Sequence, residues 1–408
     1  MPVYSHGFDA TRLQRISDHL QRCYIEPGKI VGCQTLVARY GEVAYFASFG
    51  QADRERQKPL ADDTLFRIYS MTKPVTSVAL MMLYERGMFQ LNDPISRIVP
   101  SWDSQRVWVS GEGDAIQTQP AQRAVTFRDL LTHTGGLTYG GGLPGVGIEH
   151  PVDHSYRKAQ LRTFNGRENL STFIDKLGQM PLAFQPGQHF MYSVSTDACG
   201  ALVELLSGQR FDAFLQQNIF EPLGMRDTGF HVPESKQPRF AANYQRQPDK
   251  TLKLIDDPAD SPFLKPPAFL SGGGGLVSTS RDYLRFCEML RRGGELDGQR
   301  ILGSRTIEMM RQNHLPGGKL MMDLAIGKYA ETATAGVGFG LGVASTVDPI
   351  AACSISQGEY YWGGAASTIF WIDPKEELVV IFMTQLMPSR SFDFRGQLKN
   401  LVYSALVD

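Results

Sequence analysis

Strand-like sequence at both ends of this 408-residue chain constrains its fold more than any other feature. Near the N-terminus, Gln34–Arg39 and Val43–Phe49 are rich in β-forming residues, and Tyr40-Gly41-Glu42 between them is typical of a hairpin turn. Near the C-terminus, Ser367–Ile372 and Leu378–Gln385 flank a second turn. Helical patterns lie between the two ends. We therefore expect an α+β fold, an α/β sandwich in which helices flank an antiparallel sheet built from both termini.

The helical middle of the chain predicts a second, inserted domain. We expect a sheet domain from residues 1–65 and 272–408, a mostly helical domain from residues 66–271, and an active site at their interface. The segment from Val232 to Pro267 shows no clear periodicity, and Gly140 to Gly147 is predicted to be a loop. Ser195 and Ser280 are predicted to cap helices. Further expected elements are a strand over Val337–Thr346 and a closing helix over Leu398–Leu406.

Composition argues against several classes of function. The 41 Lys and Arg residues nearly balance the 42 Asp and Glu residues, so charge gives no reason to expect nucleic acid or an anionic membrane as a partner. The sequence has no run of about 18 apolar residues that could span a bilayer. Five dispersed cysteines indicate free thiols rather than a disulfide or zinc framework. The N-terminus lacks the apolar core of a signal peptide, because Leu13, Ile16 and Leu20 instead suit an amphipathic helix. A cytoplasmic location is therefore expected.

A serine and a lysine three residues apart, Ser70 and Lys73, stand where a helix is predicted to begin. Residues at this spacing lie on one helical face, with Cβ atoms roughly 5–6 Å apart, so the amine can reach the hydroxyl. Pro74 is tolerated only because it falls in the first turn. The apolar residues that follow at helical spacing are Val75, Val78, Ala79, Met82 and Leu83.

Ser-x-x-Lys alone is a weak pattern, and a capping serine beside a solvated lysine would explain it. Two distant features strengthen the functional interpretation. Tyr192 follows a Pro-Gly turn and precedes a predicted helix, and the segment Trp362-Gly363-Gly364-Ala365 is predicted to open a β-strand. A serine hydroxyl needs a proton acceptor nearby, which lysine or tyrosine provides when its environment favours loss of the proton.

Together with these features, three further segments carry a resemblance to a known family. They are Asp129-Leu130-Leu131-Thr132-His133-Thr134-Gly135-Gly136-Leu137, Pro222-Leu223-Gly224-Met225 and Gly273-Gly274-Gly275-Leu276-Val277-Ser278-Thr279. Over nearly its whole length, the chain resembles family VIII carboxylesterases, serine hydrolases with the class C β-lactamase and penicillin-binding-protein fold. In this resemblance the three segments identify the fold rather than the chemistry, and His133 is structural.

The resemblance implies a role for each site residue. Ser70 would be the nucleophile, and Lys73 and Tyr192 would share the general acid and base work, with the division between them left open. The backbone N–H groups of Ser70 and Ala365 would form the oxyanion hole. Trp362, Gly363 and Gly364 would border the substrate, although Trp362 could instead be plain core. No cofactor or metal is implied.

Two departures from β-lactamases bear on the substrate. Trp362 stands where that fold usually carries the lysine or histidine that faces a substrate carboxylate, so an apolar wall replaces a charge. Val194 stands where β-lactamases carry an asparagine that would bind a substrate amide, and valine cannot form that hydrogen bond. Both changes favour a less polar, less anionic substrate than a penicillin.

These observations predict an enzyme that hydrolyses short-chain carboxylic esters, with a small-molecule ester as its partner. An acyltransferase with the same chemistry is the first alternative, and weak β-lactamase or D-amino-peptidase activity is the second. A catalytically silent binding protein is a different class, and the presence of Ser70, Lys73 and Tyr192 together argues against it. The oligomeric state is not predicted.

Overall fold

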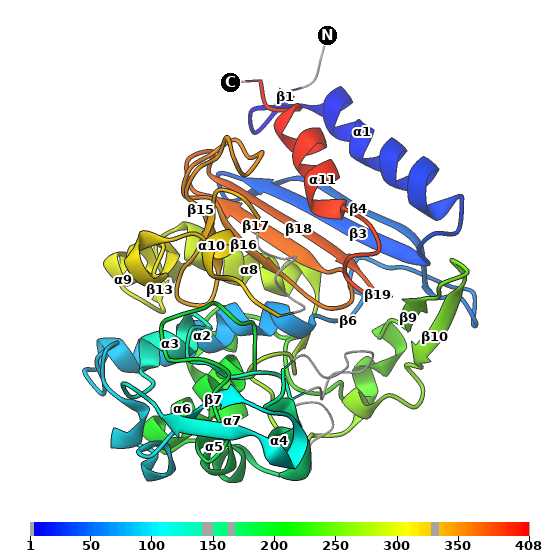
Figure 1. Cartoon of the computed structure of the whole chain (residues 1–408). Helices are drawn as coiled ribbons and strands as arrows, with labels where there is room; N and C mark the ends of the chain where they lie inside the picture. The colour runs from blue at the N-terminus through cyan, green and yellow to red at the C-terminus, as the bar shows by residue number, and fades with distance from the viewer. Residues whose placement is uncertain (1–3, 141–149, 162–167, 328–333, 408) are drawn as a thin grey trace.

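The computed structural model describes residues 4–140, 150–161, 168–327 and 334–407, and an eight-stranded antiparallel sheet lies at its centre (Figure 1). Two neighbouring strands inside the sheet come from opposite ends of the sequence, because β18 pairs with β3 over seven residues. The fold is thus α+β with a sheet built from both termini, as predicted. In spatial order the strands are β14 (Val337–Phe339), β15 (Ala344–Thr346), β16 (Tyr360–Gly363), β17 (Ile369–Asp373), β18 (Leu378–Thr384), β3 (Gly32–Arg39), β4 (Glu42–Asp53) and β5 (Lys58–Pro59).

Helices cover both faces of this sheet. Helix α8 (Ser280–Arg291) packs on one face, where its Tyr283 ring lies 5.2 Å from that of Phe370. Phe370 pairs with Ile381, so the next residue of β18, Phe382, points to the opposite face. There the Phe382 ring lies 4.8 Å from Phe394 of α11 (Phe394–Tyr403), and α1 (Ala10–Leu20) packs beside α11. Strands β3 and β18 inside the sheet are therefore buried on both faces.

The helical part of the chain lies below the sheet in Figure 1 and is organised around α2 (Thr72–Glu85). This helix packs against α6 (Ser195–Ser207), and all but a few of its side chains are buried. The sequence predicted one apolar face, but α2 lies between other elements and is enclosed nearly all round. The remaining α-helices are α3 (Phe127–Leu131), α4 (Asp153–Lys158), α5 (Leu170–Gly178), α7 (Phe211–Leu215), α9 (Ser304–Arg311) and α10 (Met321–Leu324).

Short strand pairs lie outside the main sheet. The pair most important for the site is β6 (Phe66–Arg67) with β11 (Val277–Ser278), because β6 leads directly into Ser70. The other strands are β1 (Tyr4–Ser5) with β2 (Phe8–Asp9), β7 (Arg106–Ser110) with β8 (Gln117–Pro120), β9 (Asn243–Arg246) with β10 (Leu252–Asp256) and β19 (Leu386–Met387), and β12 (Glu295–Leu296) with β13 (Gln299–Arg300).

Several local expectations need correction. Trp362 and Gly363 end strand β16 rather than opening a strand, because Gly364–Thr368 forms the turn into β17. The single strand expected over Val337–Thr346 is a hairpin of β14 and β15. The segment 232–267 contains β9 and β10, which are short and largely polar; only β10 alternates, between partly buried and exposed side chains, and this gave too weak a pattern. The caps differ by one residue, because Val194 and Thr279 precede α6 and α8.

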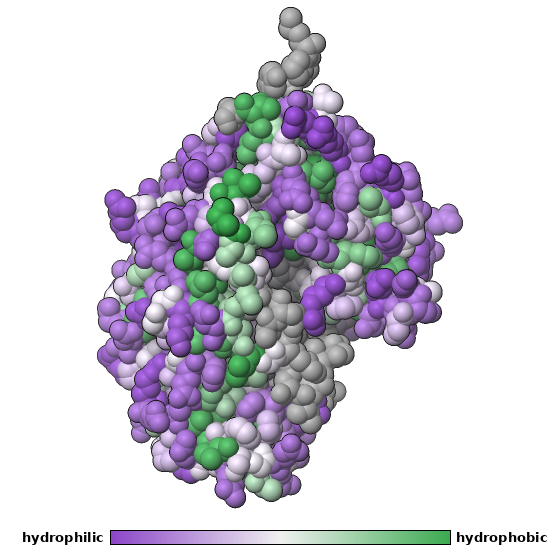
Figure 2. All heavy atoms as spheres, turned by 45° about the horizontal axis from the view of Figure 1, so that its top comes forward, coloured by the Kyte–Doolittle hydropathy of each residue, from purple (hydrophilic) through white to green (hydrophobic). Residues whose placement is uncertain are grey.

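Other expectations are confirmed or stand outside the described residues. The N-terminal amphipathic helix is α1, which buries Leu13, Ile16 and Leu20, and the closing helix is α11. Most of the predicted 140–147 loop lies outside the described residues, and the division into two domains remains a prediction. None of the helices in the described ranges combines the length and apolar character needed to cross a membrane. On the face shown in Figure 2, hydrophobic side chains form a narrow band within a largely hydrophilic surface.

Candidate active site

The nucleophile predicted at Ser70 lies in a single 3-10 turn, Tyr69–Met71, that joins strand β6 to helix α2. The residue before it, Tyr69, has a φ of +41°, in the left-handed region that is unusual for a side-chain-bearing residue. Lys73 is the second residue of α2, and its Nζ lies 3.3 Å from the Ser70 Oγ. The predicted contact between the two residues is therefore present in the structure.

Lys73 is 1% exposed and donates to three oxygen atoms at once. Besides Ser70, it donates to the backbone oxygen of Gly273 at 2.6 Å and to the hydroxyl of Tyr139 at 3.0 Å. A protonated lysine has three N–H donors and no acceptor, and the Gly273 carbonyl can only accept. This arrangement therefore suits the ammonium form of Lys73.

Tyr192 lies against the same lysine and is oriented by Trp362. The Lys73 Nζ lies 4.5 Å from the centre of the Tyr192 ring, and the Trp362 indole N–H donates to the Tyr192 oxygen at 3.2 Å. An indole N–H can only donate, so the tyrosine oxygen accepts in this contact. His133 packs on the Tyr192 ring at 4.9 Å between centres. Burial, with a smaller effect from Lys73, lowers the pKa of His133 well below 6.5, so this histidine is neutral; its structural role remains a prediction.

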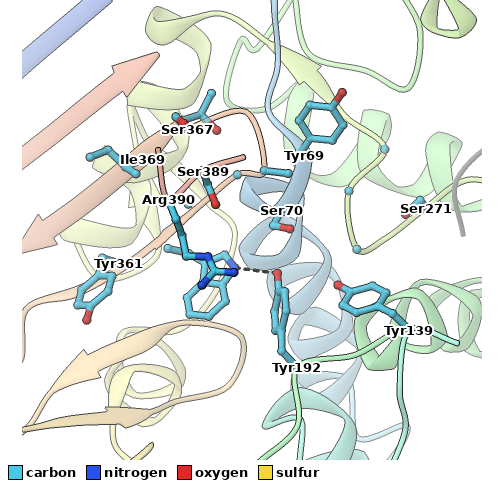
Figure 3. A pocket seen from close by; sticks show the side chains of 18 of the residues that line it. Tyr69, Ser70, Tyr139, Tyr192, Ser271, Tyr361, Ser367, Ile369, Ser389 and Arg390 are labelled. Carbon is cyan, nitrogen blue, oxygen red and sulfur yellow. Dashed lines mark hydrogen bonds between the residues drawn. The ribbon is translucent and has the colours of Figure 1, made fainter. Parts of the chain in front are cut away.

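A cavity of about 510 Å³ opens over these residues. Figure 3 shows the hydroxyl groups of Ser70, Tyr139 and Tyr192 facing one space within it. Trp362, Gly363, Gly364 and Ala365 line this cavity together with Ser70 and Tyr192. The aromatic residues that also contribute to the lining are Tyr69, Phe230, Phe263, Phe269, Tyr361, Phe392 and Phe394. The volume and the aromatic walls are typical of a small-molecule site.

The glycines after Trp362 allow the β16–β17 turn to approach the nucleophile. A Cβ added at Gly364 would collide with the backbone oxygen of Ile68, two residues before Ser70, and with the Thr368 hydroxyl. The side chain of Val194, by contrast, is 2% exposed and is not among the described residues that line the cavity. The structure therefore brings together all the predicted site residues except Val194.

Cationic side chains are also part of the cavity lining, on the side of α11. Arg390 extends into the cavity in Figure 3, and Arg395 donates to the backbone oxygen of Trp362 at 2.8 Å while stacking on the Tyr361 ring. The prediction of a less anionic substrate rests on the Trp362 indole and did not take these two arginines into account. Sequence reasoning missed these arginines, since Arg390 before α11 and Arg395 in the first turn of α11 belong to no motif.

Two further residues at the site escaped the sequence analysis. Tyr139 reaches Lys73, and Asp197 lines the cavity from the first turn of α6. Tyr139 lies two residues after the Asp129–Leu137 motif, and Asp197 lies five residues after Tyr192. Their closeness to recognised motifs was the only available signal, because each makes its contact with a residue more than 60 positions away.

Comparison with known proteins identifies the family. The profile of the family described as Beta-lactamase matches residues 18–404. The chain belongs to the beta-lactamase family. This membership agrees with the fold described above.

Individual beta-lactamase-family relatives include enzymes of ester chemistry. Esterase EstB of Burkholderia gladioli is 32% identical over 92% of this chain and 90% of its own. The solved structure of EstCE1, described as a hydrolase with promiscuous acyltransferase activity, has a TM-score of 0.75 and 29% identity, covering 97% of this chain and 98% of its own. Acyltransferase calJ of Penicillium decumbens is 26% identical over 81% of this chain and 78% of its own.

Proposed function

We propose that this beta-lactamase-family enzyme hydrolyses short-chain carboxylic esters through an acyl-enzyme on Ser70. The observation that carries the proposal is the 3.3 Å contact between Ser70 and the buried Lys73 at the base of a cavity lined by Tyr192 and Trp362. The similarity to an esterase and to a hydrolase structure supports ester chemistry in particular.

In the first step, the Ser70 oxygen attacks the ester carbonyl carbon and its proton passes to the Lys73–Tyr192 pair. The contacts favour Lys73 as the cation of the pair and the Tyr192 oxygen as the final acceptor of the Ser70 proton. The Trp362 N–H and the Lys73 charge both stabilise negative charge on that oxygen. Collapse of the tetrahedral intermediate breaks the ester C–O bond. The pair then returns the proton to the leaving alcohol.

The oxyanion of that intermediate needs hydrogen-bond donors. We assign this role to the backbone N–H groups of Ser70 and Ala365, which both line the cavity. Such preorganised donors typically contribute about 3–4 kcal/mol each to transition-state stabilisation. The collision expected at Gly364 explains why glycine precedes Ala365, since the turn must lie close to Ser70 for both groups to meet one oxygen.

In the second step, water attacks the acyl carbon and gives a proton to the Lys73–Tyr192 pair. The bond between the acyl carbon and the Ser70 oxygen then breaks, the pair returns the proton to Ser70, and the acid is released. An alcohol in place of water would make the enzyme an acyltransferase, which is the second candidate function. The 510 Å³ cavity with aromatic walls favours this candidate, because it can hold an apolar alcohol beside a short acyl group. The similarity to acyltransferase calJ supports it as well.

A labelling experiment tests the proposal. The protein is incubated with a p-nitrophenyl alkylphosphonate, and the modified peptide is identified by mass spectrometry. We expect one adduct on Ser70, loss of esterase activity in proportion to labelling, and neither labelling nor activity in Ser70→Ala. Ester cleavage by Ser70→Ala at the wild-type rate would contradict the mechanism. Product analysis with added alcohols then distinguishes hydrolysis from transfer.

A further inference from the structure

A buried carboxylate, Asp197, lies beside the catalytic lysine without a part in the mechanism above. It is 1% exposed, belongs to the first turn of α6 and lines the active-site cavity. Its Oδ1 accepts from the Ser271 hydroxyl at 2.6 Å and from the Gly273 N–H at 3.0 Å. Its Oδ2 is buried and has no hydrogen-bond partner among the residues that the structure describes. A buried carboxylate in this state needs an explanation.

Gly273 connects this carboxylate to Lys73. Its N–H donates to Asp197, and its carbonyl oxygen accepts from the Lys73 Nζ at 2.6 Å. Asp197 thus fixes the peptide that holds the lysine. The packing is tight, because a Cβ added at Gly273 would lie 2.7 Å from the Asp197 Oδ2. Asp197 and Lys73 come from different helices, α6 and α2, and the segment 271–273 lies between them.

The contacts indicate that Asp197 is ionised. A protonated carboxyl group would have to donate its O–H, and Oδ1 is already occupied by two donors while Oδ2 has no described acceptor. Burial raises the pKa of Asp197 above 3.8, and the charge of Lys73 and the two hydrogen bonds offset only part of this rise. A buried ammonium and a buried carboxylate at one site compensate each other's charge.

We propose that Asp197 is a positioning residue for Lys73, which it holds through Gly273 and whose ammonium form it stabilises by its negative charge. The proposal rests on the proposed function, since it assigns Asp197 to the proton transfer at Ser70. A carboxylate that served only the N-terminus of α6 would not need to reach across to Ser271 and Gly273 on another segment.

Asp197→Asn is the first test, because it removes the charge and keeps the shape. We expect kcat to fall about tenfold or more, since a charge-assisted contact is lost, while KM changes less than twofold. The titratable groups close to Asp197 or to its neighbour Lys73 are Lys73 itself, Cys199 of α6, and Tyr139, Tyr192 and His133 around the lysine. Removing a buried negative charge makes proton loss from these groups easier. The acidic and the basic side of the plot of kcat/KM against pH should therefore both move about one unit to lower pH.

Ser271→Ala distinguishes the positioning of Asp197 by hydrogen bonds from the effect of its charge. It removes one hydrogen bond to Oδ1 and leaves the carboxylate, so kcat should fall severalfold while the pH limbs keep their positions. This variant also keeps the proposal testable if Asp197→Asn does not fold. Asp282→Asn is the matched control, because Asp282 is a buried carboxylate of α8 that binds the Asp227 N–H and the Thr228 hydroxyl outside the cavity. Its kinetics should equal those of wild type.

The result that overturns the proposal is a folded Asp197→Asn with wild-type kcat and an unshifted pH profile, or a Ser271→Ala with wild-type kcat. Folding of every variant is checked by Tm. Failure of the proposed function gives a different result, namely ester cleavage that survives Ser70→Ala. Phosphonate labelling of Ser70 that is slower in Asp197→Asn than in Asp282→Asn supports both conclusions together.

Discussion

The indole N–H of Trp362 donates a hydrogen bond to the phenolic oxygen of Tyr192 across 3.2 Å, joining residues 170 positions apart in the sequence. Trp362 is thus a hydrogen-bond donor at the site as well as part of the aromatic wall. Its ring lies 5.3 Å from that of Tyr192, so the two side chains fix each other's orientation.

Trp362→Phe should lower kcat about 10- to 100-fold with little change in KM, because it removes the N–H that stabilises negative charge on Tyr192 and keeps an aromatic ring. Steady-state kinetics on a p-nitrophenyl ester measures this effect. Trp371→Phe is the matched control, since the Trp371 indole N–H is buried in the next strand and has no hydrogen-bond partner in the described parts of the chain. Equal kinetics of the two variants would show that the N–H of Trp362 has no catalytic role.

Tyr139→Phe tests the residue that the sequence did not reveal. The loss of its hydroxyl removes one of three acceptors around the Lys73 Nζ, and we expect about a tenfold lower kcat. Tyr45→Phe serves as the control, because it removes a hydroxyl bonded at 2.8 Å to Ser17, on α1 and away from the cavity. A kcat for Tyr139→Phe within twofold of wild type would mean that Ser70 and Gly273 suffice to hold the lysine.

Gly364→Ala should destabilise the protein by about 1–3 kcal/mol, because the new methyl group must push the β16–β17 turn away from Ile68 and Thr368. The same displacement should lower esterase activity, since Ala365 moves with the turn. Chemical denaturation measures the first effect. At Gly229 an added Cβ would meet nothing closer than 3.9 Å, so Gly229→Ala should be nearly neutral. Similar unfolding free energies for both variants would contradict the close approach.

The stability of the protein should depend on pH through Asp227. Hydrogen bonds from Arg239, together with Lys236, lower the pKa of this carboxyl group to about 2 from 3.8. The ion pairs therefore stabilise the fold above about pH 4, and this contribution disappears as the pH falls through about 2. After allowance for its partial exposure, Asp227→Asn should cost about 1 kcal/mol at pH 7 and less at pH 3. A difference between the two proteins that grows on acidification would disprove this assignment.

How far the sequence predicts this site depends on how far apart the partners are. Ser70 and Lys73 were predictable because helix geometry alone places them together. The Trp362–Tyr192 contact was not, since periodicity carries no information on which loops meet. The position of Trp362 at the end of β16 was also missed, because the glycines after it suggested a strand start, while the turn they form is fixed by pairing with β17. The predicted helix caps differ from the observed caps by one residue, which is the ordinary precision of helix boundaries.

The pairing of β3 with β18 also bears on how the protein is made. A ribosome releases Gly32–Arg39 long before the strand that pairs with it, Leu378–Thr384. Until then, an apolar strand edge stays open, and edges of this kind favour aggregation. The large sequence separation also predicts slow closure of the sheet. Chaperone dependence during synthesis, and sensitivity to truncation after residue 377, are therefore expected properties of this architecture.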